Sequence, residues 1–241
     1  MIFKKFARGL FAGALICLAA SGALAAPITT PVGLNPGDQY RLIFVTDAVR
    51  DGTSSDIADY NDFVTAVANS VTELAALATT WMAIASTATV DARDNTGTNT
   101  LTGLPIFQLN PASSKVADDD ADLWDGVPDL ALIYNENGAV PTTSSRIWTG
   151  TTGAGFKSPD AFLGAVSPRT GLVGALDSRW IAHIQQAGTE EFRFYALSAP
   201  LTVPTPAPAP IGLLVAGLAG IAVMHRGRLG CGGRKTSTVG A

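Results

Sequence analysis

The stretch QYRLIFVT at residues 39–46 has the alternating pattern of an extended strand, and both of its faces are largely apolar. Successive side chains of a strand point to opposite faces. The two sets are Tyr40, Leu42 and Phe44 on one face, and Arg41, Ile43 and Val45 on the other. The turn residues Pro36-Gly37-Asp38 precede the stretch and give it a sharp start. The pattern therefore predicts a strand that is buried on both sides.

A second alternating stretch, residues 191–198, closes the same region of the chain. We expect it to form a strand that pairs with 39–46. Between the two, apolar residues at spacings of three and four predict one main amphipathic helix: Ile57, Tyr60, Val64, Val67 and Val71. Loop residues 51–55 supply its start, and Asp56 and Asp59 suit the positive end of the helix dipole. A shorter helix over 72–77 and a strand over 80–86 should follow.

The region from 86 to about 188 has a different composition, rich in Asn, Asp, Gly, Thr, Ser and Pro. Short apolar groups interrupt it at 104–109, 130–134, 146–149 and 180–184. No long helix fits this pattern, so a long loop-rich region is expected, and such a region needs apolar residues of its own to pack on. Five aromatic residues could form this second core: Phe107, Trp124, Trp148, Phe162 and Trp180.

The amino-terminal residues have the three parts of a secretory signal peptide. Basic Lys4, Lys5 and Arg8 precede an apolar run at 9–18, and small residues follow up to Ala23-Leu24-Ala25. We therefore expect residues 1–25 to be removed on export. The exported region is then 26–202, a length of 177 residues that is enough for one domain with a substantial core.

The carboxy-terminal residues also form an ordered set of signals. Val203-Pro204-Thr205-Pro206 opens a proline-rich run, residues 211–224 are apolar, and basic residues that include Arg226 and Arg228 follow. At ~1.5 Å per residue the apolar run would span roughly 21 Å as a helix, against a hydrocarbon core of roughly 30 Å. Basic residues beside a membrane helix stay in the cytoplasm, so the preceding region should lie outside.

This arrangement resembles the carboxy-terminal signal of bacterial PEP-CTERM proteins, in which a proline-rich motif, a short transmembrane helix and an arginine cluster follow one another. Thr205 stands where that family usually has Glu. The resemblance implies a sorting motif and transmembrane helix at 203–225 and a cytoplasmic tail at 226–241. It also implies transient anchoring in the inner membrane of a Gram-negative-type bacterium, processing by an exosortase-type enzyme, and delivery to the cell surface or outside the cell.

Charge and cysteine content exclude several functions. Residues 26–202 contain 9 basic and 20 acidic residues, a formal charge of 9 − 20 = −11. Nucleic acid is therefore not an expected partner. Neither Cys17 nor Cys231 lies in the exported region, so a disulfide, thiol chemistry and a cysteine zinc site are excluded there.

The order of expected elements resembles the C-type-lectin-like fold in its endostatin-like or cysteine-free form. The residues that carry this resemblance are Trp81-Met82-Ala83-Ile84, Ala92-Arg93-Asp94, Val116-Ala117-Asp118, Trp148-Thr149-Gly150-Thr151, Trp180-Ile181 and Phe194-Tyr195-Ala196-Leu197. It implies an α+β domain with paired terminal strands, one main amphipathic helix and a long loop-rich region. The calcium-binding tripeptides of sugar-binding lectins, Glu-Pro-Asn, Gln-Pro-Asp and Trp-Asn-Asp, are absent from this sequence.

The densest acidic run, DDDADLWD at 118–125, is a candidate calcium site. Oxygen ligands at alternate positions, Asp118, Asp120 and Asp122, suit calcium, and Asp129 is twelfth counting from Asp118. Leu123 occupies the sixth position, where a calcium loop needs Gly to turn. The other interpretation is a solvated acidic loop without any cofactor, whose Asp side chains cap local turns. We expect at most weak calcium binding.

The other motifs favour structural roles. The glycines of GTTGAG at 150–155 lack the order of a phosphate-binding loop and fit a tight turn after the Trp148 strand. His183 is the one histidine of the exported region, which excludes a zinc site of several histidines, and no G-x-S-x-G accompanies it. The tryptophans fit core anchors better than sugar-stacking platforms.

The sequence leaves three functions open. The first is a non-enzymatic cell-surface or matrix protein, sorted as above and associated with exopolysaccharide. The second is a secreted hydrolase that acts on polysaccharide through two carboxylates in one cleft, and the third is a calcium-dependent carbohydrate-binding module. Carboxylate geometry in the folded domain discriminates among them.

Overall fold

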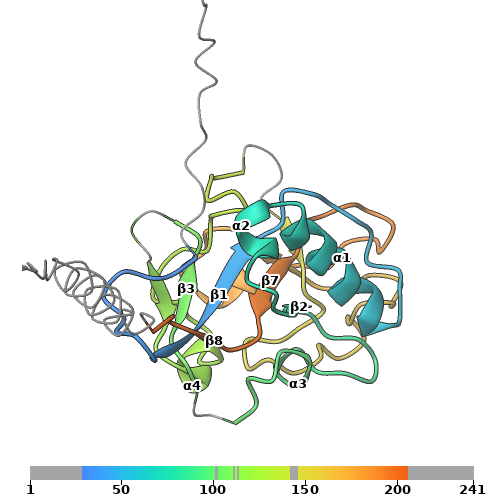
Figure 1. The fold of residues 1–241 in the computed structure, drawn as a ribbon. Helices are drawn as coiled ribbons and strands as arrows, with labels where there is room; N and C mark the ends of the chain where they lie inside the picture. Colours follow the sequence, from blue (N-terminus) through green and yellow to red (C-terminus); the bar gives the residue numbers. More distant parts are fainter. Residues whose placement is uncertain (1–28, 101–102, 111, 113, 142–145, 206–241) are drawn as a thin grey trace, which may run out of the picture.

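A computed structural model describes residues 29–100, 103–110, 112, 114–141 and 146–205 (Figure 1). Its elements follow in chain order: β1 Gln39–Val45, α1 Ile57–Asn69, α2 Thr72–Ala75, β2 Trp81–Ala83, α3 Ala92–Asn95, β3 Ile106–Gln108, β4 Lys115–Ala117, α4 Asp120–Leu123, β5 Arg146–Trp148, β6 Thr170–Leu172, the 3₁₀ turn η1 Ser178–Trp180, β7 Tyr195–Ser198 and β8 Leu201–Thr202. The domain is of the α+β class, with a single long helix and long loops between short strands.

The first and last long strands of the domain pair, as the sequence predicts. β1 lies in the middle of a mixed sheet of order β2-β7-β1-β3-β4, and β8 pairs with its amino-terminal end. β7 runs antiparallel to β1, with Ile43 opposite Leu197, whereas β3 runs parallel to it. Figure 1 shows β1 and β7 side by side at the centre of the molecule. A central position explains why both faces of residues 39–45 are apolar.

The two faces of β1 belong to two separate cores. Tyr40, Leu42 and Phe44 pack in the first core with residues of α1, whereas Ile43 and Val45 pack in the second. All five side chains are buried. The structure therefore confirms both the strand and the assignment of its alternate side chains to two opposite faces.

Helix α1 covers the first face beside β2 and β7 (Figure 1). Its N-cap is Asp56, whose carboxylate accepts a hydrogen bond from the Ala58 amide at 2.9 Å, an interaction that contributes about 1 kcal/mol. Tyr60 of α1 stacks on Phe194, with ring centroids 5.2 Å apart. The expected helix is thus confirmed, and its apolar stripe packs on the sheet.

The second core expected from the loop-rich region is present, but only two of the five aromatic residues belong to it. Phe107 and Trp148 belong to the first core, Trp124 and Trp180 to the second, and Phe162 to neither. The physical reason is that the loop-rich region contributes apolar residues to both faces of the sheet. It supplies most of the second core, including Leu123, Ile147 and Ile181, whereas Phe107 and Trp148 pack on the face that α1 covers.

The expected terminal segments lie outside the described residues. These are the signal peptide at 1–25, Pro206 and the transmembrane helix of the sorting region, and the tail with Arg226 and Arg228. Within the described residues, no helix is long and apolar enough to cross a membrane.

Candidate functional site

The acidic run at 118–125 folds into a strand end and one helical turn. β4 ends at Ala117, and Asp119 caps α4 by accepting hydrogen bonds from the Ala121 and Asp122 amides at 2.8 and 3.0 Å. Asp129 joins the run because its amide donates to the Val116 carbonyl at 3.1 Å. The local turn preference of aspartate thus shapes the loop, as expected for Asp-rich turns.

Three carboxylates of this loop converge. Asp118, Asp122 and Asp129 each offer an oxygen within 4.8 Å of the other two, and the group is open to solvent. Part of its charge is already compensated, because Lys115 forms an ion pair with Asp118 and the Asp118 amide donates to the Asp122 carboxylate at 2.6 Å. Partial burial, followed by the charges of Asp125 and Asp119, raises the pKa of Asp122. The arrangement offers oxygen ligands without a closed coordination shell.

The set of expected ligands Asp118, Asp120 and Asp122 has to be revised at Asp120. This side chain is only 2% exposed and accepts a hydrogen bond from the Thr100 hydroxyl at 2.8 Å. Burial is the main cause that raises the pKa of its carboxyl group, and the positive charge of Arg41 opposes that effect. Asp118 precedes α4, and the hydrogen bond from its amide to the Asp122 carboxylate holds these two residues together. The side chain of Asp120, the first residue of α4, turns inward to Thr100 instead.

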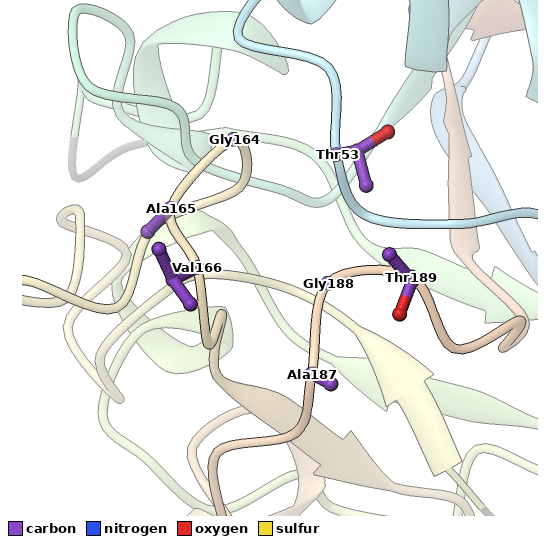
Figure 2. A pocket seen from close by; sticks show the side chains of 7 residues that line it. All are labelled: Thr53, Gly164, Ala165, Val166, Ala187, Gly188 and Thr189. Atoms are coloured by element: carbon purple, nitrogen blue, oxygen red, sulfur yellow. The ribbon is translucent and has the colours of Figure 1, made fainter.

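Two cavities among the described residues are lined without any carboxylate. The first, of about 330 Å³, is lined by two glycines, two alanines, Val166 and two threonines (Figure 2). Figure 2 shows these residues coming from three separate loops, with short side chains around an open space. The second, of about 390 Å³, lies where the two ends of the domain meet, with Thr30 and Pro204 in its lining. Neither cavity offers the pair of acids that glycoside hydrolysis requires.

The tryptophans are core anchors, as expected. Trp81, Trp148 and Trp180 are fully buried, and Trp124 is 6% exposed. Their rings are therefore not available as stacking platforms for sugars. His183 is half-buried, and its amide donates to the Thr170 carbonyl at 2.6 Å, which ties its loop to β6. The glycine turn is also confirmed, since Gly150 and Gly155 have positive φ angles of 62° and 79°.

Val203, the first residue of the expected sorting motif, is part of the folded domain. Val203 is 7% exposed and packs in the first core, whereas Pro204 and Thr205 are exposed. The Val203 amide donates to the Asp38 carbonyl at 2.9 Å, and the Val203 carbonyl accepts from the Gly37 amide at 3.0 Å. Nothing in the sequence pattern indicates this docking, because Val203 stands at the start of a proline-rich run.

Sequence analysis also does not predict the buried charged side chains of Glu136 and Arg193. The Glu136 carboxylate accepts a hydrogen bond from the Asp47 amide at 2.8 Å, and the Asp47 carboxylate accepts one from the Arg193 guanidinium at 2.8 Å. Arg193 and Glu136 are 2% and 6% exposed. These residues are far apart in the sequence and have no spacing in common, so no local signal could have joined them.

Comparisons with known proteins give no assignment: no family model matches the chain, and no curated protein matches it at a significant level.

Proposed function

We propose that this chain is a non-enzymatic exported protein that an exosortase-type system delivers to the cell surface or the extracellular matrix. Residues 211–224 would anchor it in the inner membrane until processing within the motif at 203–206. One observation carries the proposal. The last strand, β8, ends at Thr202, and the proline-rich motif begins at the next residue. A folded domain followed at once by a sorting motif is the layout that such delivery requires.

The place where the chain enters and leaves the domain supports the same proposal. The Thr29 carbonyl accepts a hydrogen bond from the Tyr40 hydroxyl at 2.7 Å, and Tyr40 lines the same cavity as Thr30, Thr202 and Pro204. Both ends of the domain therefore lie at one side of it. A domain of this form can stand on the membrane by either end without a long connection across its surface.

The domain itself is proposed to have a C-type-lectin-like fold without lectin activity. Support comes from the pairing of β1 with β7, from α1 and α2 between them in the chain, and from the Trp81-led strand β2 beside β7. Fold alone implies no activity. The buried tryptophans and the lack of carboxylates in both cavities favour a structural role over a polysaccharide hydrolase.

Reporter fusions test the topology. An enzyme that is active only outside the cytoplasm, fused after Pro200, should be active, and the same enzyme fused after Ala241 should be silent. Replacing Arg226 and Arg228 with Asp should weaken this asymmetry, because basic residues set the orientation of a membrane helix. Replacing the exposed Arg179 with Asp is the matched control and should change nothing. Activity of both fusions on the same side of the membrane contradicts the proposal.

A further inference from the structure

Val203, the first residue of the proposed sorting motif, follows β8 directly and is hydrogen-bonded to the turn that precedes β1. Val203 uses both of its backbone groups, with its amide bound to the Asp38 carbonyl and its carbonyl bound to the Gly37 amide. Its side chain is buried in the first core beside Leu201. After Val203, Pro204 and Thr205 are exposed.

The strand that holds Val203 in place is short. β8 has two residues, Leu201 and Thr202, which pair with Tyr40 and Gln39 of β1. A strand with so few ladder contacts can separate from its neighbour while the rest of the domain stays folded, because local openings cost less free energy than global unfolding. Opening of β8 would release Val203 together with the residues that precede it.

The backbone groups of Val203 that a processing enzyme would bind are already hydrogen-bonded to Asp38 and Gly37 in the folded domain. Enzymes that bind a peptide segment usually hold it extended, accept hydrogen bonds from its amides and donate hydrogen bonds to its carbonyls. While Val203 is docked, neither of its groups is free, and its side chain cannot enter a recognition pocket. The folded state therefore presents an incomplete motif.

We propose that docking of β8 gates processing, so that Val203, Pro204 and Thr205 become accessible together to the processing enzyme only when β8 separates from β1. This inference rests on the proposed function and adds a control step to it. In the reaction, one peptide C–N bond within the motif breaks, and the acyl carbon is taken by water or by an amine of a surface acceptor. The membrane fragment keeps the nitrogen, which gains the proton.

A reversible cross-strand lock tests the gate in the full-length chain within its own host. Gln39 and Thr202 are exposed and face each other across β1 and β8, so Gln39→Cys with Thr202→Cys should form a disulfide outside the cytoplasm. The background carries Cys231→Ser. Because cleavage of a locally opened segment follows the population of the open state, the oxidised lock should slow processing at least about tenfold. Reductant in the medium should restore the wild-type rate.

Two further variants separate gating from damage to the fold. A lock across β5 and β6, Arg146→Cys with Leu172→Cys, joins partners of another strand pair and should leave processing unchanged. A Gly-Ser-Gly-Ser insertion between Thr202 and Val203 moves the motif out of its dock. It should speed processing several-fold. Combined with the oxidised β8 lock, the insertion should also restore processing, and it could not do so if the lock had acted by misfolding the domain.

The outcomes distinguish this inference from the proposed function. If the wild-type chain is processed and the oxidised β8 lock is processed at the same rate, the gate is wrong and the sorting proposal stands. If the wild-type chain is never shortened, the sorting proposal fails and the gate fails with it. Amide exchange gives a check without any variant, since the Val203 amide should exchange at least about tenfold more slowly than that of Thr205. Equal exchange would overturn the gate.

Discussion

Asn61 and Asn95 hold each other through two reciprocal hydrogen bonds between their side-chain amides, at 2.8 and 2.9 Å. The same two amides bind the backbone of Ala83. The Ala83 amide donates to the Asn61 oxygen at 2.9 Å, and the Ala83 carbonyl accepts from the Asn95 amide at 2.8 Å. β2 is an edge strand, so these groups face away from β7. The asparagine pair therefore takes the place of a neighbouring strand and closes the edge against other chains.

Breaking this pair should destabilise the domain strongly. Asn61→Leu removes the side-chain amide that bonds to Asn95 and to the Ala83 backbone, so their polar groups lose a partner. We therefore expect the free energy of unfolding to fall by about 2–3 kcal/mol. Urea denaturation of residues 26–205 measures it. Asn69→Ala, an exposed change on the same helix, is the control and should cost less than about 0.5 kcal/mol. Equal midpoints for the two variants would show that the pair does not hold the edge.

The close approach of β6 to the η1 turn depends on Gly171. A Cβ atom at this position would lie 2.1 Å from the Trp180 carbonyl oxygen, which is backbone and cannot move aside alone. Gly171→Ala should therefore lower stability by about 1–3 kcal/mol or more. Gly153→Ala, where the nearest atom is 3.7 Å away, should be close to neutral in the same thermal melt. Equal melting temperatures for the Gly171→Ala and Gly153→Ala variants would contradict the close packing of β6 on the η1 turn.

Calcium should not stabilise the domain specifically. Asp118, Asp122 and Asp129 converge, but Lys115 already pairs with Asp118 and no ring of ligands encloses the site. A ligand that binds only the native state at a hundred times its Kd would add about 2.7 kcal/mol. We expect millimolar calcium and magnesium to shift the melting midpoint equally at matched ionic strength. A calcium-specific rise that Asp129→Asn abolishes and Asp125→Asn retains would refute this and favour a cation-dependent module.

Glu136 should make the domain less stable as the pH rises. Burial raises the pKa of its carboxyl group, the hydrogen bond from Asp47 and the charge of Arg193 lower it, and the net shift is upward. A raised pKa in the folded state contributes stability that is complete below the unfolded pKa, about 4.3, and is lost as the pH rises through the folded pKa.

Glu136→Gln keeps an oxygen acceptor for the Asp47 amide and removes the buried charge. We therefore expect this variant to match the wild type near pH 4 and to melt at a higher temperature at pH 7. Glu191→Gln, the same substitution at an exposed position, is the matched control. A Glu136→Gln variant that is less stable at pH 7 would mean that attraction to the charge of Arg193 outweighs the cost of burial.

The elements that the sequence predicts correctly are those whose signal is local. The alternation in residues 39–46 and the three-and-four spacing in α1 depend on neighbours a few residues apart, so a single burial pattern identifies each of them. Pairing of β1 with β7 was also predicted, because both stretches are apolar on two faces. The parallel neighbour β3 was not, since residues 104–109 are a short apolar group without a period of their own.

The metal-ligating candidates show the limit of spacing arguments. Asp118, Asp120 and Asp122 alternate in the sequence, but one turn of helix moves Asp120 to the inside of the loop and a backbone hydrogen bond brings Asp129 beside the other two. Alternation would apply to an extended chain. Four residues of helix are too short to leave a periodic signal.

The sequence by itself determined the central strand, the main helix, the lack of cysteine in residues 26–202 and the burial of the tryptophans. Only the tertiary structure decided which core each tryptophan joins, that Asn61 and Asn95 close the β2 edge, and that Val203 is docked against Gly37 and Asp38. Composition and periodicity report on residues that are near in the chain. The asparagine pair and the docking of Val203 join residues from 34 to more than 160 positions apart in the sequence. These contacts depend on the path that the whole chain takes around the sheet.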